Sequence, residues 1–75
     1  MGRRRDPLLL AFGRRVRQLR ETRGWTQETL AERANIDRSY IAGIEAGLRN
    51  PSVKALARIA DGFSVSLSAL FEKVG

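Results

Sequence analysis

The chain contains neither cysteine nor histidine among its 75 residues. Without cysteine, no disulfide framework or thiolate metal site can form. Without histidine, the commonest metal ligand and general base is missing. We therefore expect no metal and no cofactor. An enzyme is the weakest functional class, because the serines lie mainly where helices are expected to start and no nucleophile can be paired with a base.

Long apolar runs are also missing. No segment approaches the roughly 20 apolar residues that span a bilayer, and the run LLLAF at residues 8–12 is too short for the core of a signal peptide. We expect a soluble, cytoplasmic protein with no membrane partner. A chain of 75 residues forms one small domain, near the size at which only about 60% of the unfolded surface is buried.

The net charge of +6 is concentrated at one end of the chain. Residues 1–24 hold eight arginines against Asp6 and Glu21, whereas the remainder holds six basic and six acidic residues. Such a basic block favours a polyanion as partner, nucleic acid before membrane. The run Arg3 to Arg5 has a second interpretation as a solubilising tail. We assign residues 1–6 to a basic disordered tail and residues 7–75 to a folded domain.

Residues typical of helix starts and helix ends divide the domain into five segments. The alternation of apolar and polar residues that indicates a strand is nearly absent, so the predicted class is all-α. Ile36, Ile41 and Ile44 should belong to a shared core, since such short helices are unstable alone. The other expected central members are Leu19, Leu30, Leu56, Ile59 and Phe63, with Leu9, Phe12, Val16 and Val53 also facing inward. The predicted helices extend from Asp6 or Pro7 to Gly24, from Thr26 to about Arg33, from Asp37 to Ala46, from Ser52 to a stop at Gly62, and from a cap at Ser66 through Phe71.

Residues 26–47 have the spacing of a helix-turn-helix, with two short helices separated by three residues. The second helix would turn a nearly bare face outward, with Ala42 and Gly43 behind Arg38 and Ser39. The major groove of B-DNA is about 12 Å wide, so short residues would let the helix backbone approach while its first turn reads bases. Gly43 costs about 1 kcal/mol relative to alanine in a helix, which favours a use. The alternative is that short helices tolerate alanine and glycine anywhere.

Residues 16–71 resemble the Cro/repressor-like (XRE) helix-turn-helix family of bacterial and phage regulators. The resemblance combines LRETRGWTQ, LA, IAGIEAG and RNPS in register, and DRSYIAGIEAGLRNPS is most similar to controller proteins of restriction-modification systems. The resemblance implies a compact five-helix, repressor-like DNA-binding domain. It also implies a partly buried ion pair between Arg20 and Glu45 that fixes the architecture and leaves neither charge free for DNA.

The resemblance further implies a set of DNA-binding residues. Arg38 and Ser39 would touch base edges, although Arg38 facing solvent is an alternative. Tyr40 would either stack against the first helix or place its hydroxyl on DNA. Gln27 would bind a phosphate, or else would have no partner. Arg49 and Asn50 would bind the DNA backbone, and the alternative for Asn50 is a turn residue before Pro51.

The predicted function is a sequence-specific transcriptional regulator that binds a pseudo-palindromic, double-stranded operator as a homodimer, with restriction-modification genes as candidate targets. An antitoxin-like or adaptor protein-interaction module is the alternative. No effector domain is evident, so we expect no small-molecule ligand. Leu10, on the charged side of the first helix, indicates contact with another chain or a ragged helix start. The expected dimer residues are Val65, Leu67, Leu70 and Phe71, unless all four cap the core of the monomer.

Overall fold

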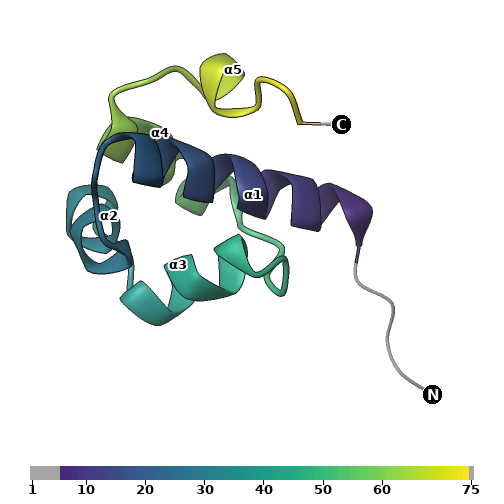
Figure 1. Ribbon diagram of the computed structural model, residues 1–75, viewed down its shortest axis with the longest axis horizontal. Coiled ribbons are helices and arrows are strands. Elements are labelled where there is room, and N and C mark those ends of the chain that lie inside the picture. The colour runs from purple at the N-terminus through teal and green to yellow at the C-terminus, as the bar shows by residue number, and fades with distance from the viewer. Residues whose placement is uncertain (1–5, 75) are drawn as a thin grey trace.

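The computed structural model describes residues 6–74, and within that range all regular structure is helical. None of these helices is long and apolar enough to cross a membrane. The predicted all-α class with five helices is therefore confirmed (Figure 1). The helices are α1 (Pro7–Thr22), α2 (Gln27–Ala34), α3 (Arg38–Glu45), α4 (Val53–Phe63) and α5 (Leu67–Leu70).

Side-chain caps begin four of the helices where the sequence predicts. The Asp6 carboxylate accepts from the Leu8 amide at 2.8 Å, and Pro7 occupies the first turn, where a missing N–H costs nothing. The side-chain hydroxyl oxygens of Thr26, Ser52 and Ser66 each accept a hydrogen bond from the backbone amide three residues further along the chain. Asp37 precedes α3 as expected, but its side chain makes no capping hydrogen bond. The start of α3 therefore depends on packing more than on a local cap.

The predicted stop at Gly62 is wrong. Helix α4 continues through Gly62 to Phe63, and Ser64 takes the left-handed conformation with φ 58°. A Cβ at Gly62 would lie 3.1 Å from the Ala34 backbone nitrogen, so this glycine allows α2 and α4 to approach closely. The other two predicted stops are correct, because Gly24 and Gly47 have φ values of 70° and 75°.

The core lies where α1 to α4 meet, and α5 closes one side of it (Figure 1). Leu30, Ile41, Ile44, Ile59 and Phe63 are fully buried, as the sequence predicts. The expected central residues Leu19, Ile36 and Leu56 are only partly buried and pack against this cluster. The centre of the core is completed by Phe12, Val16 and Leu70, whereas Val53 is 78% exposed, so its predicted inward position is wrong.

Helices α1 and α3 cross at very short range. A Cβ at Gly13 would collide with the Ile44 carbonyl oxygen and lie 2.7 Å from that of Glu45, so only glycine fits this crossing. One turn earlier, Leu10 covers Gly47, where an added Cβ would lie 2.6 Å from the Leu10 Cδ2. Leu10 thus contacts Gly47 inside the monomer and lies within a regular α1, so the expected ragged helix start is wrong, while its contact with another chain stays a prediction.

Candidate nucleic-acid interface

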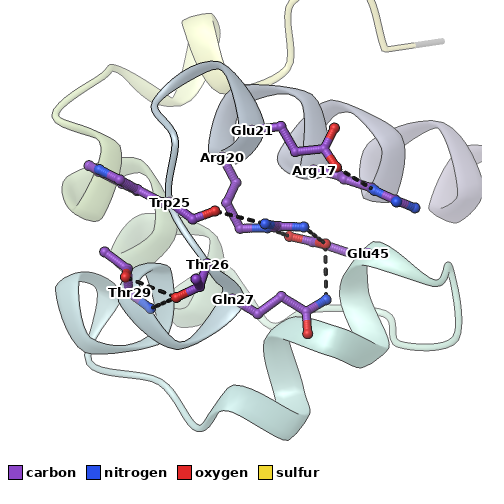
Figure 2. Close-up of polar contacts among 8 residues, drawn as sticks. All are labelled: Arg17, Arg20, Glu21, Trp25, Thr26, Gln27, Thr29 and Glu45. Atoms are coloured by element: carbon purple, nitrogen blue, oxygen red, sulfur yellow. Dashed lines mark hydrogen bonds and ion pairs between the residues drawn. The ribbon is translucent and has the colours of Figure 1, made fainter.

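A network of partly buried polar contacts fixes the position of α3 (Figure 2). Arg20 of α1 donates from Nε to Glu45 Oε2 at 2.7 Å and from Nη2 to Glu45 Oε1 at 3.0 Å. Its Nη1 donates to the Trp25 carbonyl oxygen at 2.8 Å. Only 12% of the Arg20 side chain and 4% of the Glu45 side chain are exposed, and the hydrogen bond to Glu45 raises the pKa of Arg20. This pair therefore has the architectural geometry that the family resemblance implies.

Gln27 joins the same network from the first turn of α2. Its Nε2 donates to Glu45 Oε1 at 3.1 Å, so the alternative of a glutamine without a partner is wrong (Figure 2). One amide hydrogen of that Nε2 group is not used by this bond, since an amide nitrogen carries two. The network consequently ties α1, α2 and α3 together through a single carboxylate.

The first turn of α3 stands open beside this network. The side chains of Arg38 and Ser39 are exposed, and neither forms a hydrogen bond or ion pair with another residue in the range 6–74. The inward face of α3 carries Ile41 and Ile44, which are buried in the core. Packing therefore fixes the helix and leaves one arginine and one hydroxyl available to an external partner.

The space beside Gly43 on α3 is not empty in the monomer. A Cβ at Gly43 would lie 2.7 Å from Cγ of Arg49, so the arginine already occupies the space that the glycine leaves. Ala42 and Gly43 are themselves partly buried. The outward face of α3 is less bare than its own sequence indicates, because a residue from the following loop lies across it.

Tyr40 contacts this loop. The guanidinium carbon of Arg49 lies 5.0 Å from the Tyr40 ring centroid, and the Tyr40 hydroxyl accepts from the Ser52 amide at 3.3 Å. The ring is partly buried against the core. The hydroxyl still has its own hydrogen to donate. Asn50, between Arg49 and Pro51, is exposed.

Several arginines of α1, and Arg23 directly after it, contact other residues of the monomer. Arg15 donates from Nη2 to the Ala69 carbonyl oxygen at 2.8 Å and from Nε to that of Leu70 at 3.3 Å, so it caps the end of α5. Arg17 pairs with Glu21 on the exposed surface at 3.0 Å. Arg23 lies 5.2 Å from the Trp25 ring centroid. Arg15 and Arg20 of the basic block are therefore held inside the monomer, Arg14 and Arg17 are exposed, and Arg3 to Arg5 lie outside the described range.

The four expected dimer residues divide into two pairs. Leu70 has no exposed area, so its assignment to a dimer surface is wrong, and Val65 is partly buried against the core. Leu67 and Phe71 remain 44% and 39% exposed. One face of Phe71 stacks on Phe12 with the ring centroids 5.1 Å apart. Neither the dimer assignment nor the alternative of four core residues describes the whole set.

Two residues with structural roles in this region, Gly13 and Arg15, are not among those predicted from the sequence. The signal for Gly13 was available, because a glycine inside a helix costs about 1 kcal/mol and usually has a packing reason. Arg15 had no such signal, since its acceptors are main-chain carbonyl groups 54 and 55 residues further along the chain.

Comparisons with known proteins agree with this geometry. Residues 16–70 match the helix-turn-helix family. The chain is 36% identical over 70 residues to the control protein C.MunI of Mycoplasma sp, covering 92% of this chain and 95% of that protein. It is 39% identical over 61 residues to the immunity repressor protein of Bacillus phage phi105, of which it spans only 42%.

Two solved structures are similar over most of the chain. The restriction-modification controller protein C.AhdI from Aeromonas hydrophila has a TM-score of 0.81 at 41% identity, covering 84% of this chain and 96% of that one. The controller protein C.Esp1396I bound to a 19 base pair DNA duplex has a TM-score of 0.79 at 42% identity, covering 87% of each chain.

Proposed function

Because the chain belongs to the Cro/repressor-like (XRE) helix-turn-helix family, we propose that it is a sequence-specific DNA-binding transcriptional regulator that inserts α3 into the major groove. The observation that carries this proposal is the first turn of α3. Arg38 and Ser39 are exposed and have no partner within residues 6–74, while Ile41, Ile44 and Glu45 hold the other side of the helix. A recognition helix needs one face packed firmly against the domain and an N-terminal turn whose side chains are free to contact bases.

Each exposed group has a chemical role that fits DNA. Arg38 can bind guanine O6 and N7 through two N–H donors, worth about 1–3 kcal/mol of discrimination, and Ser39 can donate or accept at a neighbouring base. Gln27 retains one amide hydrogen at the start of α2, where main-chain N–H groups favour a phosphate. Tyr40 can donate its hydroxyl hydrogen to DNA, and Asn50, which is exposed in the loop after α3, can hydrogen-bond to the DNA backbone.

The active form in this proposal is a homodimer. One domain presents only two or three base-reading side chains, so two copies are needed, on a pseudo-palindrome with half-sites about 34 Å apart. Leu67 and Phe71 supply the exposed apolar surface for the contact, since they lie on the C-terminal region and keep about two fifths of their areas exposed. Val65 would contribute only at the edge of that surface.

We also propose that the regulated genes are those of a restriction-modification system. The support is the near full-length similarity to C.MunI and C.AhdI, of which the chain covers 95% and 96%. In this account the protein acts in the cytoplasm, as a binding protein and not an enzyme, and it needs neither a cofactor nor a small-molecule ligand. Its activity would be controlled by concentration through dimerisation.

Selection of bound sites from random duplex DNA tests the proposal directly. We expect one enriched motif with two-fold symmetry, half-sites about one helical turn apart, and affinity at least about 1000-fold above that for random sequence. Affinity should also fall steeply as salt rises. A pool without any enriched motif, together with weak binding to every duplex, would instead support an adaptor or antitoxin-like module.

A further inference from the structure

Gly43, which is partly buried on the outward face of α3, has an arginine side chain as its neighbour. A Cβ built there would lie 2.7 Å from Cγ of Arg49, 3.6 Å from its Nε and 3.7 Å from its Cδ. These three atoms follow one another along the arginine side chain. The stem of Arg49 therefore runs directly over the Gly43 backbone, in a place that any larger residue would fill.

The far end of the same side chain is also in contact. The guanidinium carbon of Arg49 lies 5.0 Å from the centroid of the Tyr40 ring, within the range of a cation–π interaction. That ring is itself held, because it packs against the core and its hydroxyl accepts from the Ser52 amide at 3.3 Å. An arginine in an exposed loop is thus guided at its stem by Gly43 and at its head by Tyr40.

The head of Arg49 keeps its capacity to bind an anion. No carboxylate in residues 6–74 pairs with it, so its planar set of five N–H donors is free for a phosphate. Stacking on an aromatic face uses the face of the guanidinium and leaves the N–H groups at its edge. The arrangement orders the side chain without consuming its hydrogen bonds.

We propose that Gly43 and Tyr40 form a seat that positions Arg49 to grip the phosphate backbone beside the bases read by α3. Gly43 is then a positioning residue that acts through Arg49, and its main role is not clearance between α3 and DNA. This inference rests on the proposed function. Ordering one long side chain in advance changes affinity about threefold to tenfold, which sets the expected size of the effect.

The substitution Gly43→Ala should weaken DNA binding without lowering the stability of the domain. Alanine favours a helix more than glycine, and the group it displaces is a flexible, exposed side chain that can swing away, so Tm should stay the same or rise. Binding should weaken about threefold to tenfold on every sequence, because the lost contact is to phosphate. Lower Tm and weaker binding together would overturn this explanation.

A double-mutant cycle tests whether Gly43 acts through Arg49. Operator affinity is measured for the wild type, Gly43→Ala, Arg49→Ala and the double variant. We expect Gly43→Ala to lose its effect once Arg49 is removed. Arg14→Ala is the matched control, because it removes one positive charge from α1, away from the seat, and its effect should add to that of Gly43→Ala. An unchanged effect of Gly43→Ala in the Arg49→Ala background would show direct clearance for DNA and refute the proposal.

A measurement without DNA keeps the two proposals separable. The Arg49 protons at the guanidinium end of the side chain should show an upfield NMR shift from the Tyr40 ring, which Gly43→Ala and Tyr40→Leu should each abolish. If the shift behaves so but no duplex is bound specifically, the seat exists and the DNA-binding function fails. If specific binding is found with no ring shift in the wild type, the seat fails and the function stands.

Discussion

Replacing Arg20 with methionine should destabilise the domain far more than replacing any exposed arginine. The substitution keeps an unbranched stem but removes the three donors that bind Glu45 and the Trp25 carbonyl. Glu45 would then keep a carboxylate that is 4% exposed, with only Gln27 as hydrogen-bond donor. A buried charge that has lost its partner carries a large desolvation penalty.

The expected loss is about 3–5 kcal/mol, the usual cost of breaking a buried ion pair by removing one partner. A domain of this length has a total stability of roughly 4–11 kcal/mol, at about 0.05–0.15 kcal/mol per residue. Each kcal/mol lowers Tm by about 4–8 °C at this size, so Tm should fall by at least about 12 °C. Urea unfolding followed by Trp25 fluorescence, together with calorimetry, measures both quantities.

Arg17→Met is the matched control on the same helix. Arg17 pairs with Glu21 at 3.0 Å, but both side chains are more than half exposed, so its loss should cost about 0.3–0.5 kcal/mol. That small effect should disappear near 1 M salt, where charges are screened within about 3 Å, while the effect of Arg20→Met persists. Replacing both Arg20 and Glu45 with methionine should recover most of the lost stability.

Equal losses for Arg20→Met and Arg17→Met would refute the reasoning. They would mean that the buried pair is no more than a surface contact and that α3 is fixed by its isoleucines alone. A double variant as unstable as Arg20→Met would also contradict it, because the penalty is attributed to an unpaired Glu45.

Four further substitutions test single residues of the fold and of the expected dimer surface. Gly13→Ala should lower the free energy of unfolding by about 1–3 kcal/mol in urea titrations, because its Cβ meets rigid backbone of α3; higher stability would disprove the close crossing. Ser64→Gly should raise Tm by relieving about 1 kcal/mol of left-handed strain, and an unchanged Tm would count against it. Leu67→Glu should weaken self-association in sedimentation without unfolding the monomer, and unaltered association would remove Leu67 from the dimer surface. Leu70→Ala should lower the free energy of unfolding by about 2–5 kcal/mol, because Leu70 is buried.

The sequence predicts helix starts well, because they depend on bonds between near neighbours. Thr26, Ser52 and Ser66 each cap an amide three residues away, and that spacing is visible in the chain. The sequence predicts helix ends less well, because they also depend on contacts between distant segments. Gly62 resembles a stop, yet the contact of α4 with Ala34 makes it a packing residue and moves the left-handed position to Ser64.

The candidate site shows the same division between local and distant causes. The helical period places Ser39 opposite the buried isoleucines, whereas Arg38, three residues before Ile41, is exposed at the first position of the helix. The position of Arg49 over Gly43 does not follow, because a loop residue has no helical period to place it. Likewise, the burial of Leu70 but not Phe71 depends on how α5 docks, and Arg15 sets that through carbonyl groups with no sequence signal.

The central claim, that α3 reads DNA with its first turn, is tested most directly by comparing the motifs selected by the wild type and by Arg38→Ala. Arg14→Ala serves as the control, because it removes the same charge from α1. We expect Arg38→Ala to lose the preference at one base pair in each half-site, about 1–3 kcal/mol, while Arg14→Ala keeps the whole motif. An Arg38→Ala motif identical to that of the wild type would contradict the account.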